Sequence, residues 1–136
     1  MLVFTKEWIE ALAASLRENE KYQKSAKGFN STFQFVVESV PKKGVTKTKS
    51  CGLKTPECEE TWEGIKTGAD FTMTASYETY YKICTGKMNA IVAMTTRKAK
   101  VKGNMVKLLK YTSATNNFVE AIQQLPNEFE GDFADM

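Results

Sequence analysis

The hydrophobic positions near the N-terminus follow a helical spacing. Four apolar side chains recur every three or four residues: Ile9, Leu12, Ala13 and Leu16. Thr5 precedes them and has the side chain of a helix N-cap. The pattern predicts a helix that begins after Thr5 and ends before Gly28.

From about residue 29 the period changes to two, which is typical of β-strands. Phe33, Phe35 and Val37 share one face of the first predicted strand. Three further strands are predicted, at residues 45–53, 58–65 and 70–75, the last two from alternation. The segment 45–53 is rich in Lys and Thr, which favours an exposed or edge strand because lysines discourage edge-to-edge pairing.

The second half of the chain is mainly helical in pattern. The predicted elements are a helix from Ser76 to Gly86, a helix across 88–94, a strand at 98–103, a helix capped by Asn104, and a helix capped near Thr115 that ends before Pro126. A run of strands with helices grouped around it predicts an α+β fold, with helices on one face of a mostly antiparallel sheet.

The chain reads as one domain over residues 1–125, followed by a short acidic tail at 126–136. The acidic residues of the tail are Glu128, Glu130, Asp132 and Asp135. Two aromatic residues, Phe129 and Phe133, lie among them. The sequence leaves open whether the tail is disordered or folds back over the apolar tunnel that is considered below.

Composition excludes several kinds of chemistry. The 136 residues include no histidine, which excludes Ser-His-Asp and Cys-His catalysis and the common zinc sites with imidazole ligands. The odd number of cysteines, Cys51, Cys58 and Cys84, favours reduced thiols and a cytoplasmic location. No apolar run approaches the roughly 20 residues that span a bilayer. We therefore expect no metal site, no cofactor and no membrane-spanning segment.

The second half contains an excess of adaptable apolar residues. Four of the six methionines lie between residues 73 and 105. Methionine suits surfaces that accept apolar ligands of variable shape. The same residues also fit ordinary core packing, so the pattern alone leaves both interpretations open.

Charge is unevenly distributed, although the net charge is only +3. Between Glu78 and Glu120 there is no acidic residue, whereas the segment 82–110 carries eight Lys and Arg residues. Such a face could attract anionic headgroups, the phosphates of acyl-CoA or nucleic acid, or simply be solvated. The chain has 17 lysines and two arginines, which disfavours nucleic-acid reading because arginine makes most bidentate base and phosphate contacts.

Residues 69–111 resemble the sterol-carrier-protein type 2 domain in the order and spacing of their motifs. The matching segments are Asp70 to Thr74, Ser76 to Gly86, Met88 to Thr95, and Lys100 to Gly103 leading to Leu108 and Leu109. The segment 89–93 is more apolar than is usual in that family, and the link 95–100 is more basic.

The resemblance implies a five-stranded, mostly antiparallel sheet, covered on one face by about five helices, with an apolar tunnel between the layers. The expected tunnel wall consists of Phe71, Met73, Ile83, Met88, Ile91, Met94, Met105, Leu109, Phe118 and Ile122. Weaker candidates for contacts with a charged headgroup are Lys98, Lys100 and Lys102.

These observations predict a protein that binds and transfers lipids without catalysis. The expected ligands are fatty acids, acyl-CoA or sterol-like amphiphiles, with transient contact to a membrane surface; the oligomeric state stays open. The alternatives are a nucleic-acid or protein interaction module that uses the segment 82–110, an enzyme with a Cys84 thiolate or a shifted carboxylate, and a domain whose cavity is permanently filled or collapsed.

Overall fold

The computed structural model describes residues 1–134. The helices and strands, in chain order, are α1 (Lys6–Glu18), α2 (Glu20–Ser25), β1 (Ser31–Glu38), η1 (Pro41–Lys43), β2 (Lys49–Thr55), β3 (Thr61–Glu63), β4 (Phe71–Ser76), α3 (Tyr77–Cys84), α4 (Ala90–Thr95), β5 (Lys100–Lys102), α5 (Met105–Lys110), α6 (Thr112–Gln123) and η2 (Gly131–Phe133). This confirms the predicted α+β class.

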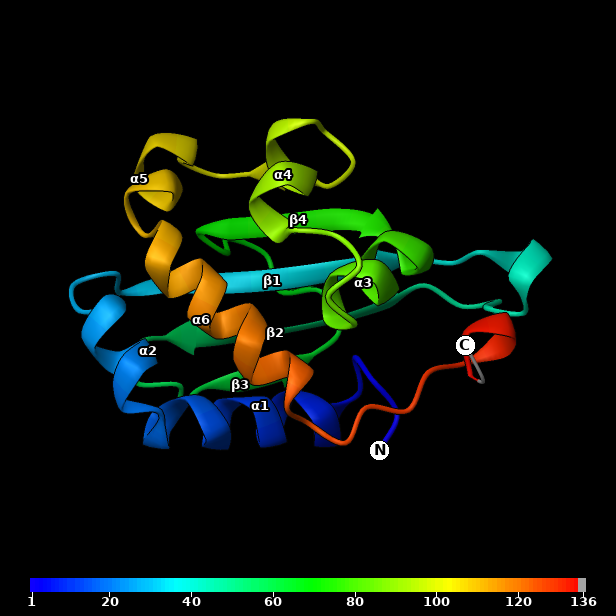
Figure 1. The fold of residues 1–136 in the computed structure, drawn as a ribbon, viewed down its shortest axis with the longest axis horizontal. Coiled ribbons are helices and arrows are strands. Elements are labelled where there is room, and N and C mark those ends of the chain that lie inside the picture. The colour runs from blue at the N-terminus through cyan, green and yellow to red at the C-terminus, as the bar shows by residue number, and fades with distance from the viewer. Residues whose placement is uncertain (135–136) are drawn as a thin grey trace.

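The five strands form one mixed sheet in the order β3-β2-β1-β4-β5 (Figure 1). Three of the four neighbouring pairs are antiparallel, whereas β1 and β4 pair in parallel. The parallel register places Phe35 opposite Met73, and the antiparallel register places it opposite Cys51. The predicted mostly antiparallel sheet is therefore confirmed, with β1 at its centre.

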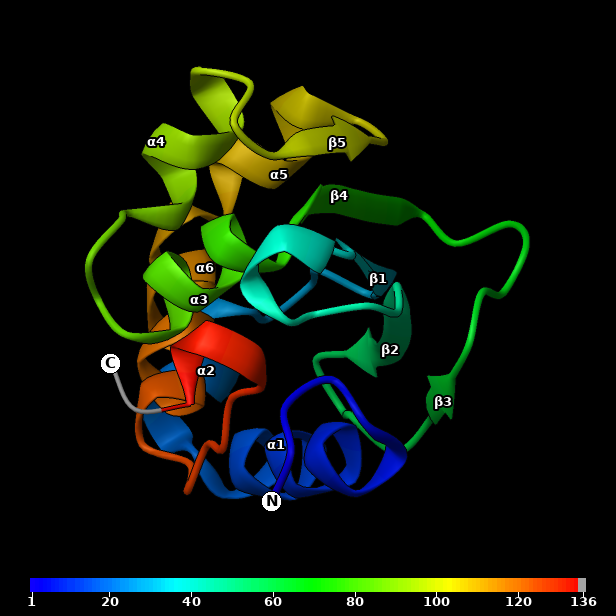
Figure 2. The ribbon, with the colours of Figure 1, turned by 90° about the vertical axis from the view of Figure 1, so that its right-hand side faces the viewer.

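The helices gather on one face of the sheet, and the long β3–β4 connection extends on the other side (Figure 2). Helix α6 crosses the covered face diagonally, and α1 lies at the β3 end (Figure 1). Apolar side chains of β1 and β4 therefore face α6, and the core forms between these two layers. Within residues 1–134, no helix combines the length and apolar character needed to cross a bilayer.

The first predicted helix is in fact two helices. The Thr5 hydroxyl accepts a hydrogen bond from the Trp8 N–H, which confirms the predicted N-cap. The prediction of one continuous helix is wrong because Asn19 leaves the helical conformation. Its side chain accepts from the Tyr22 N–H and so begins α2.

The prediction that the Lys-rich second strand lies at an edge is wrong. Strand β2 lies between β1 and β3, and the sheet edges are β3 and β5. Cys51 and Leu53 are fully buried and anchor β2 in the sheet. Gly52, on the opposite face, leaves room for the Trp62 ring, which a Cβ atom there would approach to 2.3 Å.

The strand-to-helix boundaries of the second half follow the predicted caps. Ser76 ends β4 and its hydroxyl accepts from the Thr79 N–H at the start of α3. Asn104 accepts from the Lys107 N–H and begins α5. The predicted cap near Thr115 is wrong, because α6 begins at Thr112 and the Thr115 hydroxyl instead donates to the Tyr111 carbonyl within the helix.

The C-terminal segment packs against α3 and the N-terminus. The Phe133 ring is 2% exposed and lies 5.0 Å from the Tyr81 ring, measured between centroids. The Trp8 indole N–H donates to the Asn127 side chain over 2.8 Å. Glu128 forms a salt bridge with the N-terminal ammonium group. Asp135, assigned to the acidic tail above, lies outside the described residues.

Candidate functional site

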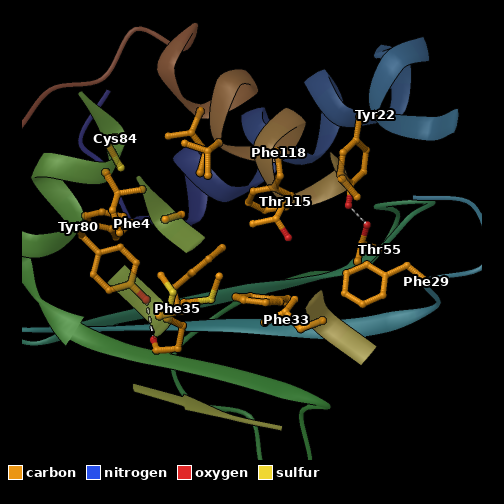
Figure 3. Close-up of a pocket in the computed structure, with 18 of the residues that line it drawn as sticks. Phe4, Tyr22, Phe29, Phe33, Phe35, Thr55, Tyr80, Cys84, Thr115 and Phe118 are labelled. Carbon is orange, nitrogen blue, oxygen red and sulfur yellow. Dashed lines mark hydrogen bonds between the residues drawn. The ribbon is translucent and has the colours of Figure 1, made fainter. Parts of the chain in front are cut away.

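An apolar cavity lies between the covered face of the sheet and α6 (Figure 3). Its floor consists of Phe33 and Phe35 on β1 and Met73 on β4. The alternation of β1 puts both phenylalanines on the same face, and the parallel register aligns Met73 with Phe35. The sequence pattern of two strands therefore produces the floor directly.

Helix α6 supplies the roof of the cavity. Its contributions are Ala114, Thr115, Phe118, Val119 and Ile122. Their spacing is that of one helical face, so a single stripe of α6 faces the sheet. The Phe118 ring lies 5.9 Å from the Phe35 ring, centroid to centroid, and closes much of the space between roof and floor.

The two ends of the cavity are aromatic. One end contains Tyr22 and Phe29, and the other contains Phe4 and Tyr80 (Figure 3). The remaining lining residues are Trp8, Thr55, Ile83, Cys84, Ala90, Met94 and Leu108. No charged side chain among residues 1–134 is part of this lining.

The cavity has a volume of about 60 Å³. Cavities that hold small organic ligands measure about 300–1,000 Å³. The walls must therefore move before a ligand of ordinary lipid size fits.

The polar groups at the cavity are bonded within the protein. The Tyr22 and Thr55 hydroxyls share a hydrogen bond at one end, and the Tyr80 hydroxyl donates to the Met73 carbonyl over 2.6 Å at the other. Thr115 donates to the Tyr111 carbonyl over 3.2 Å. These internal bonds leave an almost purely apolar surface for a ligand.

Burial keeps the ionisable groups of the cavity neutral. It raises the pKa of the Cys84 thiol from 9.0 to about 12. Burial also raises the pKa values of the Tyr22 and Tyr80 hydroxyls, above the range in which phenols ionise in water. At neutral pH Cys84 is a thiol rather than a thiolate, so the geometry gives no support to a thiol-based enzyme.

A second hollow, a groove more open to solvent than the cavity, lies between α4 and α6. Its lining consists of Gly86, Met88, Asn89, Ala90, Asn116, Val119, Glu120 and Gln123. Ala90 and Val119 belong to both the groove and the cavity. These two side chains therefore separate the cavity interior from the surface.

The family-model comparison gives a match to the SCP-2 sterol transfer family over residues 9–116. The chain belongs to this family. The general function of an SCP-2 domain is to bind and transfer lipids, and the family is in general not enzymatic. The predicted family resemblance is thus confirmed, and the match covers every element that forms the floor of the cavity.

Solved structures show the same SCP-2 fold. A crystal structure of sterol carrier protein 2 matches with a TM-score of 0.82 and 24% identity, over 90% of this chain and 98% of that one. A Thermus thermophilus protein described as possibly a sterol carrier protein matches with a TM-score of 0.81 and 24% identity, over 91% of this chain and 90% of that one.

A more distant match is palmitated SCP2L2 from Aedes aegypti, with a TM-score of 0.50 and 13% identity over 91% of this chain and 96% of that one. No curated protein gives a sequence match. The structural likenesses establish the SCP-2 fold, and the family assignment rests on the match over residues 9–116.

Half of the ten residues expected in the tunnel wall line the cavity of this SCP-2 domain: Met73, Ile83, Met94, Phe118 and Ile122. Phe71 is buried next to the cavity, with its ring 5.8 Å from Phe33, but is not part of the lining. Met88 lines the outer groove. Ile91 and Met105 are partly buried elsewhere, and Leu109 is 41% exposed.

The expected headgroup residues lie outside the cavity. Lys100 and Lys102 belong to edge strand β5, and Lys98 precedes it. All three side chains are exposed. The aromatic ends of the cavity were absent from the sequence prediction. Phe4, Tyr22 and Phe29 lie in the N-terminal part of the chain, outside the region of closest family resemblance, and Tyr80 lies within that region but was not among the expected wall residues.

Proposed function

We propose that this SCP-2 domain binds the acyl chain of a fatty acid or acyl-CoA, or a sterol-like amphiphile, in the cavity beneath α6. The observation that supports this proposal is the apolar lining, whose hydroxyl groups are hydrogen-bonded within the protein. Such a site gains free energy from apolar burial and offers little to a polar substrate. The distant structural match described as palmitated SCP2L2 is consistent with an acyl ligand.

A flexible chain suits this cavity better than a rigid ring system. A cavity of about 60 Å³ has to expand around its ligand. An acyl chain can enter stepwise while Met73 and Met94 change rotamer, because methionine side chains adapt easily to new shapes. A fused ring needs its whole volume at once.

The polar head of such a ligand belongs outside the apolar lining. A carboxylate or phosphate inside would lose its hydration without gaining a charged partner. The groove between α4 and α6 offers the Asn116 and Gln123 amides close to the cavity wall. The exposed Lys98, Lys100 and Lys102 stay candidates for longer, phosphate-bearing headgroups such as that of acyl-CoA.

Titration with a fluorescent fatty acid tests the proposal. Saturable binding is expected, and non-fluorescent fatty acids should compete more strongly as their chains lengthen. Each buried CH₂ contributes about 0.8 kcal/mol, or about a fourfold change in Kd, until the chain fills the cavity. Headgroup changes should alter Kd less than chain length does.

Ala114→Trp supplies the site-specific variant, because Ala114 is buried in the roof of the cavity. Its larger side chain should fill the space and abolish saturable binding. Ser113→Trp is the matched control, since Ser113 is the exposed neighbour on the same helix. Circular dichroism verifies that both variants fold. Absence of saturable binding to the unmodified protein, as expected of a permanently collapsed cavity, would overturn the proposal.

A further inference from the structure

Three large apolar side chains are exposed on α4 and α5, at one end of the molecule. The exposed fractions are 69% for Val106, 51% for Val92 and 41% for Leu109. Figure 2 shows α4, β5 and α5 together at this end, and Figure 1 shows α4 and α5 there. We refer to α4, β5, α5 and the turns between them, residues 90–110, as the basic end.

The basic end carries cations and no acidic residue. The cations are Arg97, Lys98, Lys100, Lys102, Lys107 and Lys110. Among the described residues, none of these six forms a salt bridge. Lys107 lies over the Phe29 ring at 5.8 Å, and the other five cations are exposed. This end therefore combines an uncompensated positive charge with protruding apolar groups.

The inner side of the same elements forms part of the cavity wall. Ala90 and Met94 on α4 and Leu108 on α5 line the cavity. Leu108 is the one buried residue of α5. A short helix that fully buries one side chain and packs Met105 on the core only in part is easily displaced, so contacts on the outer side of α5 can change the cavity on its inner side.

We propose that the basic end docks onto an anionic lipid surface, with the lysines at the headgroups and Val92, Val106 and Leu109 in the interfacial layer. This inference deepens the proposed function, on which it rests, by naming the surface from which the ligand enters. Positive charge attracts anionic leaflets, and exposed apolar groups gain from burial at the headgroup boundary.

The apolar side chains are the observation that favours a membrane over nucleic acid. The phosphate backbone of a nucleic acid attracts cations. It offers no favourable contact to Val106, a valine that is 69% exposed among lysines. The basic end also contains just one of the two arginines of the chain, Arg97. A lipid interface satisfies both the charged and the apolar groups.

Cosedimentation with vesicles tests the docking surface. Binding to phosphatidylcholine vesicles that contain phosphatidylserine is expected, with weak binding to phosphatidylcholine alone and a decrease as ionic strength rises. Val106→Ser with Leu109→Ser should weaken vesicle binding at least about tenfold, and Arg97→Gln with Lys110→Gln by a similar factor.

Two matched controls use other parts of the surface. Ile65→Ser removes an apolar side chain with the same exposed fraction as Val106, in the β3–β4 connection. Lys42→Gln with Lys47→Gln removes two exposed lysines from the region around η1. Both controls should bind vesicles like the unmodified protein, and circular dichroism confirms that each variant is folded.

Three results would overturn the docking surface: no binding to anionic vesicles, equal loss in the controls, or salt-sensitive binding to duplex DNA in place of vesicles. Fatty-acid titration without vesicles separates this proposal from the proposed function. The docking variants should keep their solution Kd for fatty acid while losing vesicle binding. Vesicle binding by a protein that takes up no fatty acid would refute the proposed function and leave the docking surface intact.

Discussion

Phe118 is the residue that most restricts the cavity. Its ring lies 5.9 Å from Tyr22, 5.9 Å from Phe35 and 6.5 Å from Phe33, measured between centroids. It thus contacts one end and the floor of the cavity from its position on α6. Because the cavity measures only about 60 Å³, the rotamer of this one side chain affects how much space a ligand finds.

Phe118→Ala should enlarge the cavity and favour bulkier ligands. The free energy of unfolding should fall by about 3 kcal/mol, at the low end of the range for Phe→Ala because Phe118 is partly exposed. Kd for a branched or ring-containing amphiphile should decrease relative to Kd for a short linear fatty acid. Urea unfolding and competition titrations measure the two effects.

Phe129→Ala is the control for this substitution. Phe129 is also partly buried and packs on Tyr81, with 4.8 Å between ring centroids, but it does not line the cavity. The Phe129→Ala variant should be less stable than the unmodified protein but should keep its ligand preference. An unchanged preference in Phe118→Ala would show that this ring does not limit the cavity.

Half of the cavity lining expected from sequence was located by periodicity. Phe118 and Ile122 share a helical face of α6, and Met73 alternates with polar neighbours, so their direction follows from the sequence. The direction of the Leu109 side chain does not follow from the sequence. Helix α5 fully buries a single side chain, and the pattern cannot tell which apolar residue that is. Tyr22 and Phe29 reach the cavity by tertiary packing, of which the local pattern carries no trace.

At the scale of elements, α5 is the weakest part of the cavity wall. It has six residues, one buried side chain, and a cap in which the Asn104 side chain accepts from the Lys107 N–H over 3.1 Å. A helix this short depends on its cap and on tertiary packing. The cap therefore influences how often Leu108 leaves the cavity wall.

Asn104→Ala should loosen α5 and accelerate lipid exchange. Loss of the cap costs about 1 kcal/mol, and this cost falls on α5 first. Amide hydrogen exchange should increase across residues 105–110, and the dissociation rate of a bound fluorescent fatty acid should increase severalfold. Stopped-flow transfer to empty vesicles measures that rate.

Thr5→Ala provides the comparison, because it removes the equivalent cap of α1. Thr5→Ala should lower the free energy of unfolding by a similar amount. Helix α1 should nevertheless stay packed, because it has five buried residues. The dissociation rate of the ligand should stay unchanged. Equal acceleration in both variants would mean that exchange follows global stability rather than the motion of α5.

The order of elements was largely predictable, and their exact limits and positions were not. Caps at Thr5, Ser76 and Asn104 follow from local hydrogen bonding, which a sequence displays directly. The position of β2 in the sheet depends on Cys51 and Leu53 packing against the rest of the core. The half-buried Lys49 and the exposed Lys54 of β2 obscure that packing, so this inner strand resembles an edge strand in sequence.

For the whole molecule, the location of charge says more than its sum. The net charge of +3 conceals a basic end without acidic residues and a C-terminal segment that includes Glu128 and Glu130. Glu130 forms a salt bridge with Lys49 at 3.1 Å, and Glu128 with the N-terminal ammonium group, so the acidic segment is bound to the domain far from the basic end. The cavity between these two regions is uncharged.

The neutral core also gives the whole molecule a pH dependence with a definite sign. Burial raises the pKa values of the Cys51 and Cys84 thiols from 9.0 to about 12. In the unfolded chain these thiols lose their protons near pH 9, whereas the folded protein retains them, so the folded state binds more protons above that pH. The stability that these two thiols contribute is therefore fully present below about pH 8 and is lost as the pH rises toward 12.

Between about pH 9 and 12, each buried thiol should lower the free energy of unfolding by up to about 1.4 kcal/mol per pH unit. Urea unfolding at a series of alkaline pH values measures it. Cys51→Ala should lower the free energy of unfolding at pH 7, because it leaves a small void. It should also reduce the loss of unfolding free energy per pH unit at alkaline pH by the contribution of one thiol. A variant with the slope of the unmodified protein would show that the Cys51 thiol already ionises in the folded state, and that burial does not hold its pKa high.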